Sequence, residues 1–153
     1  MAKQRDAIRM SEGEVEAFLD SSKTLVVATL GRQGAPHMTA LWFARRGGNV
    51  IFETYGASQK VVNLRRDPRL AVLCERGETY DELRGVSISG TAEIVDHGSR
   101  LKELMAVIIN RNTPGLTPDA LASHVAAMIR KRLVVIVHAE KIISWDHRKL
   151  KVK

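Results

Sequence analysis

The stretch PHMTALWFARRGGNVIFET, residues 36–54, holds two strand-like segments joined by a glycine-containing turn. Residues 37–44 and 50–54 are rich in apolar and β-branched side chains, and RRGGN (45–49) supplies the glycines of a tight turn. Alternation places two sets of side chains on opposite faces of the first strand: Met38, Ala40, Trp42 and Ala44 on one, His37, Thr39, Leu41 and Phe43 on the other. The stretch therefore predicts an antiparallel hairpin.

Outward from this hairpin, short apolar runs separated by turns continue in both directions. The pattern predicts further strands at residues 24–30, 69–75, 84–96, 133–140 and 141–146. It predicts helices at about residues 11–20, 59–66, 99–111 and 119–131. Ser11 and Glu14 fit a capping box at the first helix, and Gly90 favours a bulge or a barrel corner in the long strand. We expect a mainly β fold with α, a closed or nearly closed antiparallel barrel with helices outside, because closure removes exposed sheet edges.

Length and composition indicate one globular domain, residues 1–153, with 44% hydrophobic and 27% charged residues. Cys74 is the only cysteine, so an internal disulfide is excluded, and its apolar surroundings favour a core position. The N-terminal segment is polar and no apolar run approaches the ~20 residues of a membrane span. We therefore expect a cytoplasmic protein with no membrane partner.

The net charge of +7 favours an anionic partner but does not choose among nucleic acid, phosphorylated cofactors and acidic substrates. Only seven aromatic residues are present, few for a platform that stacks nucleic-acid bases. No triad, P-loop or zinc-protease motif occurs, and the five histidines are scattered, so we expect no metal site. No catalytic residue can be named, and an enzyme of this kind would take its chemistry from a cofactor.

One segment, TYGASQKVVNLRRDP (54–68), has the composition of an anion site. Ser58 opens the predicted helix and Lys60 lies in its first turn, where unpaired backbone N–H groups and the helix dipole favour negative charge. Asn63, Arg65 and Arg66 follow within two turns. The alternative is a surface helix with solvated charges, and the segment alone does not decide between the two.

The order of these strands, turns and helices resembles that of the pyridoxamine 5'-phosphate oxidase-like split-barrel superfamily. The resemblance rests on PHMTALWF, RRGGN, VIFET, SQK, NLRRDP and LAVL, and it covers residues from about 11 to 150. The segment YDELRGVSISGTAEIVD is similar to the B group of flavin/deazaflavin oxidoreductases, many of which bind coenzyme F420. The resemblance implies a homodimer of FMN-binding split-barrel type, with cofactor sites at the interface.

The resemblance also assigns residues to the cofactor site. It implies ring contacts from Met38, Thr39, Ala40 and Leu41, and places Thr54 near the ribityl chain. Ser58, Gln59 and Lys60 fall where the phosphate is held, and Asn63, Arg65 and Arg66 face a longer anionic tail. Trp145 would close the site, from its own or the partner subunit.

The sequence departs from the oxidase proper, because its strand at residues 36–43 has no basic residue except His37 and its C-terminus, SWDHRKLKVK, lacks the usual substrate segment. The resemblance therefore implies an F420-dependent reductase that transfers a hydride to a small conjugated or heteroaromatic substrate. The alternative within the same fold is an FMN- or FAD-dependent oxidoreductase or flavin carrier. A basic nucleic-acid-binding protein is the third and least favoured alternative. We therefore expect no nucleic-acid partner.

Overall fold

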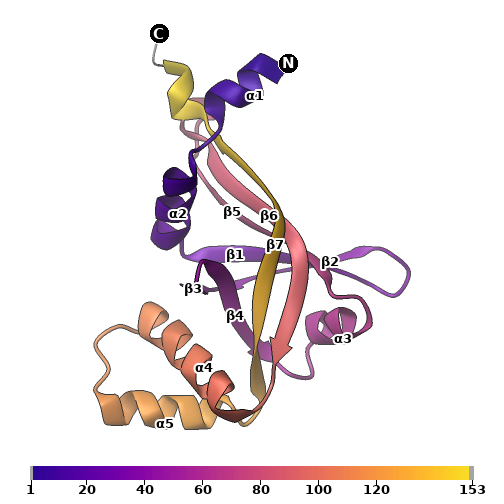
Figure 1. Cartoon of the computed structure of the whole chain (residues 1–153), viewed down its shortest axis with the longest axis vertical. Coiled ribbons are helices and arrows are strands. Elements are labelled where there is room, and N and C mark those ends of the chain that lie inside the picture. The colour runs from indigo at the N-terminus through magenta and orange to yellow at the C-terminus, as the bar shows by residue number, and fades with distance from the viewer. Residues whose placement is uncertain (1, 152–153) are drawn as a thin grey trace.

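A computed structural model of the chain describes residues 2–151. Seven antiparallel strands form one sheet in the order β2-β1-β5-β6-β7-β4-β3, which curls into a half-barrel (Figure 1). The strands are β1 (Thr24–Leu30), β2 (Pro36–Trp42), β3 (Ala44–Arg46), β4 (Asn49–Tyr55), β5 (Arg69–Arg76), β6 (Arg84–Val95) and β7 (Arg132–Asp146). The helices are α1 (Ala2–Ile8), α2 (Glu12–Ser21), α3 (Gln59–Arg66), α4 (Gly98–Asn112) and α5 (Pro118–Met128), with 3₁₀ turns at Tyr80–Glu82 and His147–Lys151. The predicted split-barrel class is confirmed.

The predicted hairpin of residues 36–54 differs in detail from what the structure shows. β2 ends at Trp42, and the segment predicted as a turn instead contributes the short strand β3 before Gly47 and Gly48, both with positive φ. The expected alternation holds as far as Trp42, where Met38, Ala40 and Trp42 are exposed. Placing Ala44 on that face was wrong, because both Phe43 and Ala44 are buried where the chain turns from one strand into the next.

β6 and β7 form a long arm that extends toward the end where both termini lie, and β5 pairs with the other edge of β6 from Arg84 to Thr91 (Figure 1). The prediction of two strands at 133–140 and 141–146 was wrong, since β7 is continuous and pairs with β6 along its length. A register shift falls between Ser89 and Gly90, as the glycine predicted. A Cβ on Gly90 would lie 2.0 Å from the carbonyl oxygen of His138, so only glycine allows this close approach.

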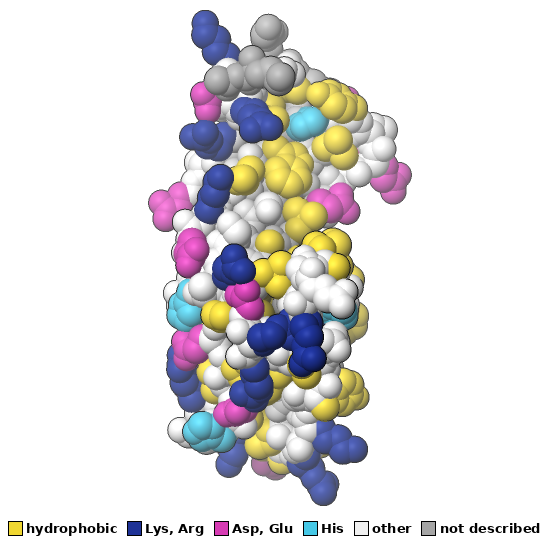
Figure 2. Space-filling view, turned by 90° about the vertical axis from the view of Figure 1, so that its right-hand side faces the viewer, with side chains coloured by type: hydrophobic (Ala, Val, Ile, Leu, Met, Phe, Trp, Pro, Cys, Tyr) yellow, Lys and Arg dark blue, Asp and Glu magenta, His cyan; other side chains and the backbone are white. Residues whose placement is uncertain are grey.

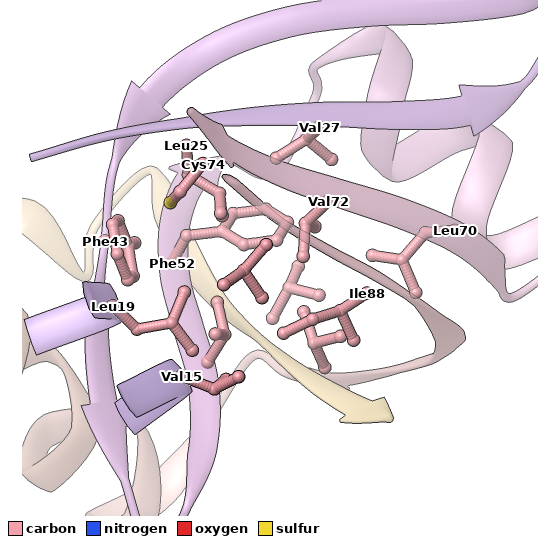
Figure 3. Packing of buried hydrophobic residues seen from close by; sticks show 14 of the residues in the cluster. Val15, Leu19, Leu25, Val27, Phe43, Phe52, Leu70, Val72, Cys74 and Ile88 are labelled. Atoms are coloured by element: carbon pink, nitrogen blue, oxygen red, sulfur yellow. The ribbon is translucent and has the colours of Figure 1, made fainter. Parts of the chain in front are cut away.

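The core lies between the concave face of the sheet and α2, whose capping box of Ser11 and Glu14 is present as predicted. Figure 3 shows Val15 and Leu19 of α2 directed toward Phe52 and the neighbouring strand residues. α2 therefore contributes to the main core and does not only cover the barrel. Burial of such side chains supplies the dominant stabilising term.

A second apolar cluster joins α4 and α5 to the other face of β4 and β7. Met105 and Val134 are fully buried in it. α5 ends at Met128, three residues before its predicted end, and α1, which lacks an apolar stripe, was not predicted. In the described residues, no helix is both long and apolar enough to span a bilayer.

Candidate functional site

The helix α3 is held against the barrel by its apolar face. Val61 and Leu64 are buried in the main core, and the helix spans residues 59–66 as its pattern predicts. Gly56 donates its N–H to the carbonyl of Lys131 at 2.9 Å, which fixes the turn that leads from β4 to the helix. Ser58 is the N-cap residue, yet its side chain makes no cap hydrogen bond. The N-terminal turn thus retains N–H groups with no intrahelical acceptor, which can bind an anion.

Three of the predicted residues meet at this turn. The Lys60 ammonium group donates to the Thr54 hydroxyl at 3.0 Å, and the hydroxyls of Thr54 and Ser58 are 3.4 Å apart. Lys60 is half-buried, and desolvation by burial lowers its pKa below the ordinary value despite the nearby Glu53 carboxylate. A partly desolvated cation flanked by two hydroxyls is suited to hold a phosphate.

The Glu53 carboxylate is occupied by Arg132, an interaction that the sequence analysis missed. Arg132 donates to both carboxylate oxygens, at 2.8 and 3.0 Å, and its guanidinium lies 3.9 Å from the ring centroid of Tyr55. Arg132 is opposite Tyr55 in the β4–β7 register, a pairing that no local pattern indicates. Because Arg132 neutralises Glu53, the charge of Lys60 stays available to a ligand.

Asn63 was expected to face an anionic tail, but it is fully buried. Its amide nitrogen donates to the Thr29 hydroxyl at 3.0 Å, and its amide oxygen accepts from Gln59 at 2.9 Å and from Arg66 at 3.3 Å. These hydrogen bonds either join α3 to β1 or connect residues within α3. The position of Asn63 therefore indicates a structural role, in which it orients Gln59 and Arg66.

The two predicted arginines lie on the exposed side of α3. Arg65 pairs with Asp96 at 3.2 Å, and Arg66 donates to the carbonyl of Leu30 at 2.6 Å. Figure 2, which looks onto this side of the molecule, shows Lys and Arg side chains grouped near mid-height. Arg65 and Arg66 are thus accessible but each already has a partner, which a ligand would share or replace.

The strand β2 lies at the edge of the sheet, and its two faces differ. Met38 and Ala40 are exposed on the outer face, whereas Thr39 and Leu41 are partly buried on the other. Among the described residues, the Thr39 hydroxyl oxygen and His37 Nδ1 are buried atoms with no hydrogen-bond partner. Such unpaired polar atoms are uncommon and require a partner from elsewhere.

Trp145 is remote from the other predicted site residues within one chain. Thr54 pairs with Leu133 of β7, whereas Trp145 lies at the far end of that strand, opposite Gly85. Twelve residues of straight strand span about 40 Å at ~3.3 Å per residue. Figure 1 shows β7 running from the end near α5 to the end where both termini lie. Trp145 therefore does not close the Lys60 site of its own chain.

The residues present fit a phosphorylated, elongated cofactor. Lys60, Thr54 and Ser58 would hold the phosphate of such a group, and the unpaired Thr39 hydroxyl on β2 would offer a donor and acceptor to a polar ring edge. In the described part of the chain, no cluster of His, Cys, Asp and Glu has the arrangement of a metal site.

Comparison with known proteins assigns the family. The family model described as pyridoxamine 5'-phosphate oxidase matches residues 11–146. A pyridoxine/pyridoxamine 5'-phosphate oxidase from Kineococcus radiotolerans is 36% identical over 81 residues, which are 53% of this chain and 35% of that protein. The matching segment thus spans about a third of that relative's length.

Two solved structures share the fold. A conserved hypothetical protein from Mycobacterium tuberculosis has 45% identity and a TM-score of 0.91, covering 97% of this chain and 92% of that one. A protein named F420 reductase has 22% identity and a TM-score of 0.61, covering 83% and 94%. The second similarity concerns the fold alone.

The fold and the family match together define the class of protein. The chain belongs to the pyridoxamine 5'-phosphate oxidase family, within a superfamily of flavin-binding oxidoreductases.

Proposed function

We propose that the protein is a reductase that uses a deazaflavin of the coenzyme F420 type. The observation that carries the proposal is the Lys60–Thr54–Ser58 cluster at the start of α3, followed by Arg65 and Arg66 along the same helix. A simple flavin phosphate would end at the cluster. Arginines one turn further along suit a cofactor with additional acidic groups beyond its phosphate.

Each part of the chain has a separate task in this proposal. Lys60 binds the phosphate by charge, and the two hydroxyls orient it. The edge strand β2 contacts the ring through backbone groups and the side chains of one face, within Met38, Thr39, Ala40 and Leu41. When bound, a reduced deazaflavin supplies a hydride to a small conjugated or heteroaromatic acceptor, and the protein contributes positioning rather than a nucleophile.

The proposed active form is a homodimer. Trp145 and Lys60 are separated along β7 within one chain, so a site that uses both needs two copies. β2 and the β6–β7 arm carry exposed apolar side chains that a second copy could cover: Met38, Trp42, Ile142 and Ile143 are each more than half exposed. In Figure 2 hydrophobic side chains gather over the upper half of the molecule, toward the end of this arm.

Native mass spectrometry with F420, FMN and FAD added in turn tests the proposal. We expect a dimer that binds two F420 molecules at micromolar concentration and loses them when Lys60 is replaced by Met. Lys102→Met, on the exposed side of α4, is the matched control and should bind like the parent. Absence of F420 binding by the parent protein would refute the proposal.

An FMN- or FAD-dependent oxidoreductase or flavin carrier is the second candidate. It is favoured by the single lysine and two hydroxyls of the phosphate end, which suffice for FMN without Arg65 or Arg66. A yellow protein with a bound flavin spectrum, in which Arg65→Ala and Arg66→Ala leave the affinity unchanged, would support this candidate over the first.

A further inference from the structure

Arginines gather beside α2 where three neighbouring strands, β5, β6 and β7, have their ends, on the side of the sheet nearest the termini (Figure 1). Arg76 of β5 is directly opposite Arg84 of β6, and Arg84 is directly opposite Asp146 of β7. Opposite residues in antiparallel strands project to the same face. Val86, two residues after Arg84, is buried in the main core, so this is the core-facing side of the sheet. Trp145 precedes Asp146 in β7 and therefore lies on the other face, away from these arginines.

The Arg84 guanidinium group is partly buried and has no hydrogen-bond or ion-pair partner among the described residues, and its Nε is a buried atom without an acceptor. The carboxylate of Asp146, which is opposite, is occupied by Arg148, whose guanidinium donates to both carboxylate oxygens at 2.9 and 2.7 Å. Glu82, in the turn before β6, is exposed and forms no ion pair with Arg84. A guanidinium carries five N–H donors, so leaving it unpaired in a partly buried position is unfavourable.

The neighbours of Arg84 add positive charge. Arg76 donates to the carbonyl and the hydroxyl of Ser21, at 2.8 and 3.2 Å, and these neutral acceptors leave its charge unbalanced. The guanidinium carbons of Arg76 and Arg84 lie 5.2 and 5.7 Å from the centroid of the Phe18 ring. This cation–π contact accounts for the position of Arg84 but leaves its N–H donors unpaired. Burial lowers the pKa of the Arg84 guanidinium, and the charges of Arg148 and Arg76 lower it further.

We infer that Arg84 binds a phosphate group at the rim of α2, with Arg76 and Arg148 beside it adding to the positive potential. The planar guanidinium fork matches two oxygens of a phosphate, and the two unbalanced arginine charges favour a dianion over a monoanion. All of these residues meet within a single chain. The inference does not depend on the proposed cofactor, because none of them belongs to the Lys60 cluster, and Figure 1 shows α3 well away from this end of the sheet.

Calorimetric titration with inorganic phosphate at constant ionic strength tests this site. The Lys60→Met protein is the parent for these titrations, because it lacks the phosphate site proposed for the cofactor. We expect one saturable phosphate site per chain and much weaker binding of acetate, a monoanion. Arg84→Met should raise the dissociation constant for phosphate about tenfold or more, and Arg84→Lys by a smaller factor, since charge-assisted hydrogen bonds are lost. Lys102→Met removes the same charge on α4 and should have no effect.

The same titration with glycerol 3-phosphate distinguishes the source of the phosphate group: tighter binding than that of inorganic phosphate indicates a phosphomonoester ligand, and weaker binding indicates free phosphate.

Urea denaturation separates binding from a structural role of Arg84. In phosphate-free buffer, Arg84→Met should unfold at an equal or higher urea concentration than its Lys60→Met parent, because an unpaired, partly buried charge is removed. Saturating phosphate should stabilise the parent and leave the Arg84→Met variant unchanged. The inference is overturned if phosphate gives no saturable binding, if acetate binds as tightly, or if Arg84→Met binds phosphate like Lys102→Met. A variant that unfolds more easily without phosphate and binds phosphate normally would equally overturn it, since Arg84 would then serve only the contact with Phe18.

Discussion

The Lys60 ammonium group lies 3.0 Å from the Thr54 hydroxyl oxygen, half-buried and with no carboxylate ion-paired to it among the described residues. Its one nearby acid, Glu53, is bound by Arg132. A partly desolvated cation without a counter-ion is costly to the folded protein. The negative charge of a bound ligand would offset this cost.

Replacing Lys60 by Met should therefore separate binding from stability. We expect cofactor affinity to fall about 10- to 100-fold, because a charge-assisted hydrogen bond to phosphate is worth about 1.5–3 kcal/mol. The free energy of unfolding of the cofactor-free protein should stay equal or rise, since a desolvated charge is removed. Titration calorimetry and urea denaturation measure the two effects. A variant that binds normally but unfolds more easily would show that Lys60 is structural.

As the pH rises, cofactor binding should begin to weaken at a lower pH than it would if Lys60 had the ordinary pKa of a lysine. Burial lowers the Lys60 pKa from 10.5, so the group loses its proton at a lower pH than in the unfolded chain. Between the lowered pKa and 10.5 the unfolded chain binds more protons, so the cofactor-free protein gains stability relative to the unfolded chain as pH rises. An anion favours the protonated form, so binding in this range takes up a proton. Calorimetry in two buffers of different ionisation enthalpy detects that uptake, and its persistence in Lys60→Met would contradict the assignment.

Asn63→Leu should destabilise the protein without acting on the cofactor directly. The substitution leaves the buried Thr29 hydroxyl without its donor, which costs about 1–3 kcal/mol. For a chain of this size, each kcal/mol corresponds to about 2–4 °C in melting temperature. Thr29→Val removes the other partner, and the double variant should lose much less than the sum of the two single variants. Strict additivity would rule out the coupling between α3 and β1.

Stability in acid should depend on the Asp67–Arg69 pair at the end of α3. Hydrogen bonds from the Arg69 side chain and backbone lower the Asp67 pKa from 3.8 to about 2. Because the folded pKa is depressed, the stabilisation is fully present above about pH 4 and is lost as the pH falls through about 2. The difference in unfolding free energy between the parent and Asp67→Asn should shrink across this interval. A difference that stays constant down to pH 2 would argue against the pair.

Mixed dimers should show whether Trp145 serves the partner's site. Lys60→Met and Trp145→Ala are each expected to impair both sites of a homodimer. In a mixed dimer, one site would combine the intact Lys60 of one chain with the intact Trp145 of the other. We therefore expect co-expression of the two variants, with separate affinity tags, to restore one high-affinity cofactor site per dimer. Failure to restore any site would place both residues in one chain's site, whereas unimpaired binding by the Trp145→Ala homodimer would exclude Trp145.

The sequence by itself determined the local elements and the family. Residues 59–66 form a helix as predicted, because Val61 and Leu64 define its buried face and Pro68 follows its end. β1 has the predicted bounds, and Gly90 marks the register shift between β6 and β7. Hydrophobic periodicity, capping residues and glycine act over a few residues, so they can be read from the chain directly.

Only the tertiary structure decided which of the predicted site residues lie together. Asn63 was expected to face a ligand, but Thr29, thirty-four positions away, draws it into the interior. Arg132 meets Glu53 through the β4–β7 register, and the same register carries Trp145 to the opposite end of the molecule from Lys60. Strand pairing and the curvature of the sheet set these contacts between distant segments, and no pattern within a single segment specifies them.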